Sequence, residues 1–177
     1  GDLKYGNIGG YFMDHGFQDV KDENDFPKNL KKGKLNYYDE ALFDLLLDRI
    51  NGTKEPFLHC AFTGSTHSPY DHPKKANQNW KGELSDFMNS VIYADGCLNT
   101  FVQKCKKEEW FSNTLFVFVA DHGHGTPSAP DPFYNNFFRI PLLIWGEPLK
   151  KEYRGTRIGK VCSQSDIAAT LMYQMDG

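Results

Sequence analysis

FSNTLFVFVADHGHG, residues 111–125, is the stretch of sequence that decides the fold class. Residues 114–120 of this stretch are almost all apolar and rich in β-branched and aromatic side chains. Such a run is typical of a central parallel strand that is covered on both faces. Polar residues follow at once, and Gly123 and Gly125 allow a sharp bend of the backbone there. The stretch therefore predicts a buried strand that ends in a polar turn.

The preceding residues supply a helix and a second strand. Residues 83–107 carry apolar side chains at every third or fourth position, which predicts a long helix. Before them, residues 57–65 (FLHCAFTGS) form a short apolar run bounded by turn residues, which favours a buried strand. Strand, helix and strand together predict a βαβ unit with a right-handed crossover.

Two shorter helices and a third strand complete the pattern. Residues 38–50 show helical spacing of apolar side chains, and so do residues 163–173, where Ser163 or Ser165 is a candidate N-cap. Residues 140–145 form another apolar run, after a loop of about twenty residues, a length that is uncommon unless the loop has a function. Alternation of helices and strands places the chain in the α/β class.

Composition and charge exclude several kinds of protein. The 177 residues suit a single domain, 1–177, and their formal charge of −3 gives no basic field that could hold nucleic acid. No apolar run approaches the ~20 residues that span a bilayer, and neither an anchor nor a signal peptide is visible in this chain. The four cysteines lack zinc-like spacing and are expected to be reduced, mostly buried thiols.

Polar residues gather where the two predicted strands end. Ligands of open parallel sheets bind beyond the carboxyl ends of the strands. If the two strands are neighbours, His67 faces the same crevice as Asp121 and His122. A carboxylate beside an imidazole suits Zn or Mn. Alternatively, Asp121 caps a turn and the histidines lie on a solvated loop. The remaining acids offer no clear third ligand.

Other candidate side chains are more ambiguous. His124 can reach a metal or a substrate, or can simply lie on the loop, and Arg139 can bind an anionic group in a bidentate manner or pair with a surface acid. Ser65 and Thr66 are candidate nucleophiles, although turn formation is the role that their context favours. His59 lies within a predicted strand, which favours a buried, hydrogen-bonded histidine.

Five segments, taken in order, resemble one known group of enzymes. GSTHSPY, a long helix, FSNTLFVFVADHGHG, FRIPLLIWG and SQSDIAATL follow one another as in the sulfatase and alkaline phosphatase superfamily. Within it they are similar to the lipoteichoic acid synthase-like branch of bacterial, membrane-anchored phosphoglycerol transferases. The resemblance implies a three-layer α/β/α fold with a mostly parallel sheet. It also implies a partial catalytic domain whose N-terminal half is missing, together with the nucleophile and a further acidic metal ligand.

The resemblance also implies roles for individual residues. One divalent metal, Mn or Zn with Mn favoured, would be held partly by Asp121 and His122. His67 would contact the phosphate or sulfate of the substrate, and we assign His124 and Arg139 to substrate binding as well. The chain departs from the family before the middle helix, where residues 36–38 read NYY instead of the frequent Trp-Gly pair.

These expectations combine into one leading function and two rivals. The chain is expected to be the C-terminal part of a metal-dependent sulfatase-like phosphoglycerol transferase or hydrolase, inactive alone, acting on phosphate or sulfate esters such as a phosphoglycerol lipid. Resemblance places the parent protein on the extracytoplasmic face of a bacterial membrane. One rival is a noncatalytic anion-binding module. The other is a small hydrolase that uses Ser65 or Thr66 with His67.

Overall fold

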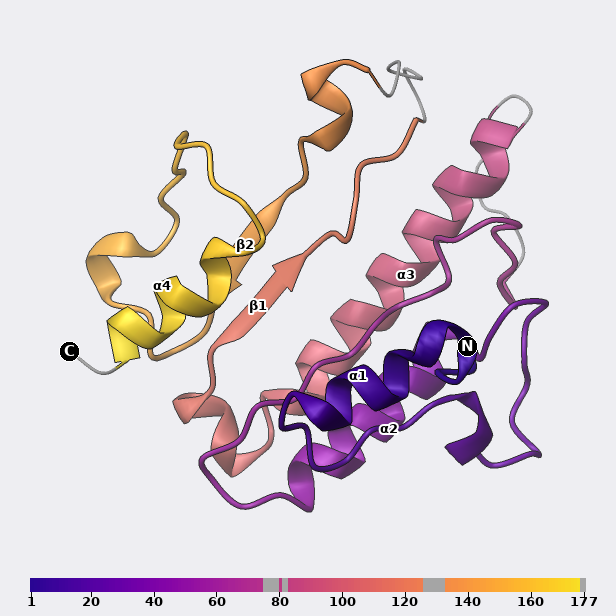
Figure 1. Ribbon diagram of the computed structural model, residues 1–177, viewed down its shortest axis with the longest axis horizontal. Coiled ribbons are helices and arrows are strands. Elements are labelled where there is room, and N and C mark those ends of the chain that lie inside the picture. The colour runs from indigo at the N-terminus through magenta and orange to yellow at the C-terminus, as the bar shows by residue number, and fades with distance from the viewer. Residues whose placement is uncertain (75–79, 81–82, 126–132, 176–177) are drawn as a thin grey trace. The chain divides into compact units, whose positions relative to one another are not determined.

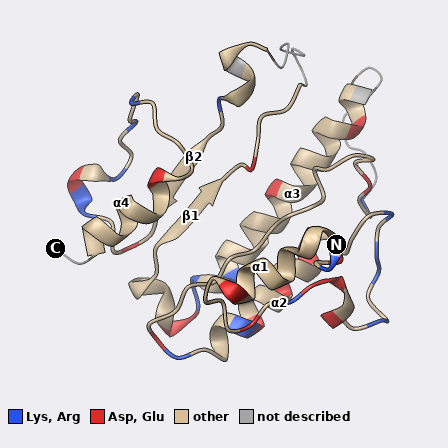
Figure 2. Ribbon diagram, in the orientation of Figure 1, with Lys and Arg blue, Asp and Glu red and all other residues tan. Residues whose placement is uncertain are grey.

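The computed structural model describes residues 1–74, 80, 83–125 and 133–175, and the chain forms two compact units, 1–108 and 109–177 (Figure 1). The helices and strands are α1 (Ile8–Asp14), α2 (Asp39–Asn51), α3 (Glu83–Cys105), β1 (Phe116–Val119), β2 (Leu142–Trp145) and α4 (Asp166–Met175), joined by short 3-10 turns and loops. In those described ranges, no helix is both long enough and apolar enough to cross a membrane. Basic and acidic residues are interspersed along the ribbon (Figure 2).

The first unit is organised by the packing of α2 against α3. Both helices form where the apolar periodicity predicts them. The aromatic rings of Phe43 on α2 and Phe101 on α3 stack with their centroids 4.9 Å apart, and both side chains are buried. Cys97 and Cys105 fill the same face of α3 at helical spacing and are buried. The helix pair therefore forms the core of this unit.

Two of the four thiols differ from the expectation. Cys97 and Cys105 are buried, but Cys60 and Cys162 are exposed, so the description "mostly buried" is wrong for half of the set. All four are free thiols, as expected.

The segment predicted as the first strand is not a strand. Residues 57–62 pair with no strand among the residues that the structure describes, where the one sheet is β1 with β2. Leu58 and Phe62 are 74% and 78% exposed. A strand is stable only when a neighbour takes its backbone hydrogen bonds, and this segment has no such neighbour here. The predicted βαβ unit is therefore wrong for the described chain.

The second unit contains an antiparallel pair of strands. β1 pairs with β2 in a register that places Phe116 opposite Trp145 and Val119 opposite Leu142. The two strands form where the apolar runs predict them, but β1 is not a central parallel strand, and Val119 is 43% exposed. The orientation could not be deduced because an apolar run carries no information about its partner's direction. Phe111, Phe116 and Trp145 gather at one end, with ring centroids 5.2 to 5.8 Å apart.

A hydrogen-bonded turn leads into helix α4. The backbone N–H of Ser163 donates to Asp166 Oδ2 at 2.7 Å, and Ser163 Oγ accepts from the N–H of Ser165 at 3.4 Å. Both predicted cap candidates therefore lie in the turn just before the helix, and the N-cap itself stays a prediction.

Candidate functional site

A tight turn follows β1 and presents Asp121 and His122. Asp121 Oδ1 accepts the backbone N–H of His122 at 2.9 Å. His122 Nδ1 lies 2.7 Å from the carbonyl oxygen of Gly123, and since a carbonyl only accepts, Nδ1 carries the proton and Nε2 has a lone pair. Nε2 lies 3.4 Å from Asp121 Oδ2, and both side chains are solvent-accessible. The turn therefore brings one carboxylate oxygen and one imidazole nitrogen close together.

The spacing of these two atoms fits a shared metal ion. Two ligands at the usual zinc distances of about 2.1 Å, separated by a tetrahedral angle, lie about 3.4 Å apart. The observed Oδ2–Nε2 distance is 3.4 Å. A mixed oxygen and nitrogen donor set suits Zn or Mn. No group of three or more His, Cys, Asp or Glu side chains is placed to hold an ion within the described ranges. Catalytic zinc usually has three protein ligands, and this pair offers two.

Two neighbouring segments hold this turn in place. Gln164, just before α4, donates from Nε2 to the carbonyl oxygens of Ala120 and Asp121 at 2.7 and 3.0 Å. Gly123 lies so close to the carbonyl of Phe137 that a Cβ would meet its oxygen at 1.7 Å. The sequence attributed Gly123 to bending of the backbone. In the structure a glycine is required there because two backbone segments of the chain, at residues 123 and 137, approach each other closely. Gln164 was missed, although it lies between Ser163 and Ser165, the two candidate N-cap residues.

His67 lies in a separate turn of the first unit. Its backbone N–H donates to the carbonyl of Gly64 at 3.1 Å, and its own carbonyl accepts from Tyr70 N at 2.8 Å. Its Nδ1 donates to the carbonyl of Ser68 at 2.6 Å, and the side chain is exposed. Nε2 therefore accepts a proton when the ring is neutral and donates a hydrogen bond when the ring is protonated.

Ser65 serves the turn instead of acting as a nucleophile. It is 3% exposed, and its Oγ accepts the backbone N–H of Asp39 at 3.2 Å. Asp39 Oδ1 in return accepts the N–H groups of Gly64 and Ser65 at 2.9 and 3.1 Å. A buried hydroxyl held in this way is not available to attack a substrate, which agrees with the predicted turn role. Thr66 is half-buried.

Asp39 is a residue that sequence reasoning did not assign to the site. Its place in the sequence indicates only an acid in the first turn of a helix, where negative charge is favoured. Nothing in the sequence shows that it contacts residues 64 and 65, because the contact joins positions 25 and 26 residues apart.

His124 and Arg139 are exposed in the second unit, and their assignment to substrate binding stays a prediction.

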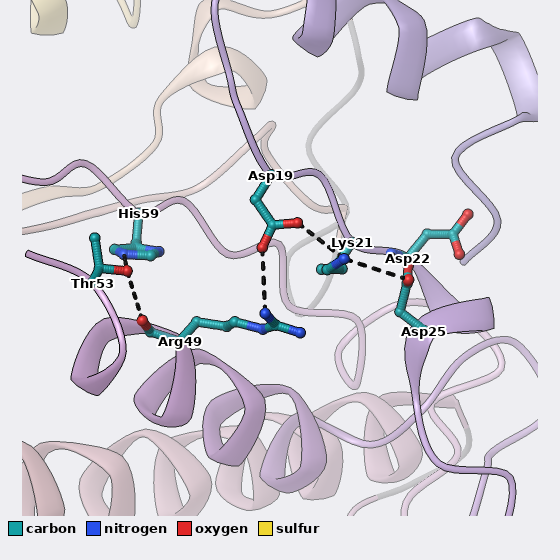
Figure 3. Close-up of polar contacts among 7 residues, drawn as sticks. All are labelled: Asp19, Lys21, Asp22, Asp25, Arg49, Thr53 and His59. Atoms are coloured by element: carbon teal, nitrogen blue, oxygen red, sulfur yellow. Dashed lines mark hydrogen bonds and ion pairs between the residues drawn. The ribbon is translucent and has the colours of Figure 1, made fainter.

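His59 belongs to a polar network, as expected for a hydrogen-bonded histidine, but it is half-buried and not on a strand (Figure 3). Thr53 Oγ1 donates to the carbonyl of Arg49 at 2.7 Å, so the hydroxyl accepts from His59 Nε2 at 3.1 Å. Burial lowers the pKa of His59, and the charge of Asp19 partly opposes this shift.

The same network fastens the N-terminal segment to α2. Asp19 lies 3.0 Å from Lys21 Nζ and 3.6 Å from Arg49 Nη1, and Lys21 also lies 3.8 Å from Asp25 (Figure 3). These side chains are a third to a half exposed, so each ion pair contributes little stability by itself. The network is structural.

Comparison with known proteins gives a consistent picture. The family described as Sulfatase matches residues 3–177. Phosphoethanolamine transferase EptA of Salmonella typhimurium is 25% identical over 166 residues, which are 78% of this chain and 29% of that protein. The chain therefore spans less than a third of EptA.

Two solved structures are also similar. A protein in the alkaline phosphatase superfamily from Vibrio parahaemolyticus is 29% identical, with a TM-score of 0.69 over 83% of this chain and 36% of that chain. The lipoteichoic acid synthase LtaP from Listeria monocytogenes is 23% identical, with a TM-score of 0.64 over 81% of this chain and 40% of that chain. The predicted α/β fold class of the alkaline phosphatase superfamily is confirmed.

Proposed function

The chain belongs to the sulfatase family, and from this premise we propose that it is the C-terminal part of a metal-dependent transferase or hydrolase of phosphate esters. One observation carries the proposal: Asp121 Oδ2 and His122 Nε2 lie 3.4 Å apart on a turn fixed by hydrogen bonds. The name of EptA, a phosphoethanolamine transferase, supports a phosphate ester over a sulfate ester as the substrate class.

Each candidate side chain has a part in this proposal. Asp121 and His122 would hold a divalent ion, Mn or Zn, with Mn favoured by the family resemblance. Such an ion, when bound, supplies positive charge beside a phosphoryl oxygen and stabilises the charge that develops during transfer. The protonated ring of His67 donates from Nε2 to a phosphate oxygen, or gives its proton to a departing alcohol. Exposed His124 and Arg139 add hydrogen-bond donors for the anionic substrate.

The nucleophile is proposed to come from outside this chain. Of the two internal candidates, Ser65 is buried and hydrogen-bonded to Asp39, and Thr66 is half-buried in the same turn. We therefore infer that the N-terminal half of the parent protein brings the nucleophile and a further acidic ligand, and that residues 1–177 alone lack turnover. The substrate proposed is a phospholipid headgroup ester, of the phosphoglycerol or phosphoethanolamine kind, at the extracytoplasmic face of a bacterial membrane.

The experiment that tests the proposal measures bound metal and turnover together. In the full-length protein that carries this chain, Asp121→Ala and His122→Ala should each lower bound Mn or Zn and abolish hydrolysis of a synthetic phosphodiester. His15→Ala is the matched control, because His15 is also exposed and also donates from Nδ1 to a backbone carbonyl, that of Tyr11. Unchanged metal content in both site variants would refute the assignment.

Phosphate titration separates the rival class. A noncatalytic anion-binding module would bind inorganic phosphate equally well before and after chelation, as measured by calorimetry. The proposed enzyme should bind phosphate more weakly once its metal has been removed.

A further inference from the structure

Asp39 is a buried carboxylate that joins two parts of the first unit. It is the first residue of α2, and it is 1% exposed. Its Oδ1 accepts the N–H groups of Gly64 and Ser65, and its own N–H donates to Ser65 Oγ, so three hydrogen bonds link the helix start to the turn. A charge is costly to bury unless it is hydrogen-bonded, and the N-terminus of a helix favours a negative one. The position is therefore built to keep an acceptor.

The turn that Asp39 holds is the one that carries His67. The N–H of His67 donates to the carbonyl of Gly64, which closes the turn on the two residues that Asp39 binds. On the other side of Gly64, a Cβ would lie 2.0 Å from Nδ2 of Asn36, so no larger residue fits without displacing that side chain. Gly64 is thus bonded to Asp39 and closely approached by the side chain of Asn36. His67, three residues later, extends into solvent from a fixed base.

We propose that Asp39 is the positioning residue of His67: through Oδ1 it fixes the turn 64–67 and hence the place where the exposed imidazole meets a phosphate ester. The inference rests on the proposed role of His67. Asp39 itself does not touch substrate, because it is 1% exposed and its Oδ1 is occupied by two backbone donors.

Only one carboxylate oxygen of Asp39 takes part in the hydrogen bonds to residues 64 and 65. Oδ2 is buried and has no hydrogen-bond partner among the described residues. An asparagine in this place keeps an oxygen acceptor for Gly64 and Ser65, loses the charge and puts an NH2 group in the place of Oδ2. Asp39→Asn is therefore the conservative variant, and Asp39→Ala is the variant that removes the acceptor.

The test uses the full-length protein that carries this chain. For Asp39→Ala we expect faster hydrogen exchange in residues 63–68 and about tenfold weaker binding of inorganic phosphate. We also expect a loss of about 100-fold in kcat/KM for a synthetic phosphodiester, mostly in kcat, since a displacement of about 1 Å in a reacting group has that effect. Asp39→Asn should restore exchange, phosphate binding and kcat/KM to within about fivefold of wild type.

A matched control and a second variant keep the test decisive. Asp48→Ala removes an exposed carboxylate from the same helix and should behave as wild type. Ser65→Ala removes one of the three hydrogen bonds and should shift exchange and phosphate binding in the same direction by less. If Asp39→Ala does not fold, Ser65→Ala carries the test.

Several outcomes would overturn the inference. In one such outcome, Asp39→Ala exchanges faster in residues 63–68 while its phosphate binding and kcat/KM equal those of Asp48→Ala. That result would show that the hydrogen bonds of Asp39 stabilise the turn but do not position His67. Asp39→Asn as damaging as Asp39→Ala would show that charge acts, not the acceptor. If Asp39→Ala does not fold, wild-type hydrogen exchange and wild-type phosphate binding in Ser65→Ala would also overturn the inference. If His67→Ala leaves turnover unchanged, the proposed function of His67 fails. Hydrogen exchange of residues 63–68 still measures whether Asp39 fixes the turn.

Discussion

Replacing Gly123 by alanine should separate the turn that carries Asp121 and His122 from the segment packed against it. A Cβ at this position would lie 1.7 Å from the carbonyl oxygen of Phe137, and real Cβ contacts are essentially never shorter than 3.0 Å. Both partners are backbone, so one of the two segments must move by more than 1 Å. Gly123 is part of the turn, since its carbonyl accepts from His122 Nδ1 at 2.7 Å. The imidazole is therefore expected to move with it.

The size of the effect follows from the tolerance of a metal site. Metal–ligand distances vary by only about 0.2 Å around their usual values, so a shift of more than 1 Å breaks the shared geometry of Asp121 Oδ2 and His122 Nε2. Disturbing the support of a ligand lowers metal affinity about 10- to 100-fold, and overpacking costs about 1–3 kcal/mol of unfolding free energy. We expect values near the upper end of both ranges.

Calorimetric metal titration and urea unfolding of the full-length protein that carries this chain measure the two effects. Gly159→Ala is the control, since nothing lies within 4 Å of a Cβ built there. Wild-type metal affinity together with reduced stability in Gly123→Ala would mean that the Phe137 segment moves while the ligands stay. That result would refute the argument that the close approach at Gly123 positions the pair.

Two further predictions concern the cysteines and a histidine. Cys105 has no exposed surface and burial raises its pKa to about 12, so it should react with a disulfide reagent only after unfolding, whereas exposed Cys162 reacts in the folded protein. Mass mapping after brief labelling checks this, and equal labelling of the two thiols would contradict it. Burial lowers the pKa of His59 in the folded state, so the unfolded chain binds more protons and stability falls as pH drops through about 6.5. The decrease in Tm from pH 8 to pH 5 should be smaller in His59→Gln than in wild type. His15→Gln serves as the control. An identical pH dependence of Tm in wild type and His59→Gln would contradict this prediction.

Local patterns were sufficient to predict α2, α3 and α4, whereas the short helix α1 was not predicted. The apolar spacing of residues 83–105 reflects a face that packs on α2, and the same periodicity locates α2 itself. Helical hydrogen bonds join residues four apart, so the sequence of one segment contains most of the information needed to predict that it forms a helix. Asp121 and His122 could also be predicted as a pair because adjacency in the sequence already brings them together.

Non-local contacts were not visible in the sequence. The apolar run at 57–62 could not reveal whether a partner strand is present, nor could the run of β1 reveal that β2 lies antiparallel to it. The contact of Asp39 with Ser65 depends on how the chain returns to the start of α2. The necessity of Gly123 depends on the path of residue 137. In each case the cause lies in a segment distant along the chain.

The position of Asp39 at the first residue of α2 gives the helix a mechanical role. About one turn further along α2, Phe43 stacks on Phe101 of α3, so the helix behaves as a short rigid rod whose N-terminal part is both packed in the core and attached to the His67 turn. Each residue of an α-helix corresponds to a rise of about 1.5 Å, so a small axial slip of the rod displaces the turn by a chemically significant amount. The packing of α2 against α3 thus determines the position of His67, which lies on neither helix.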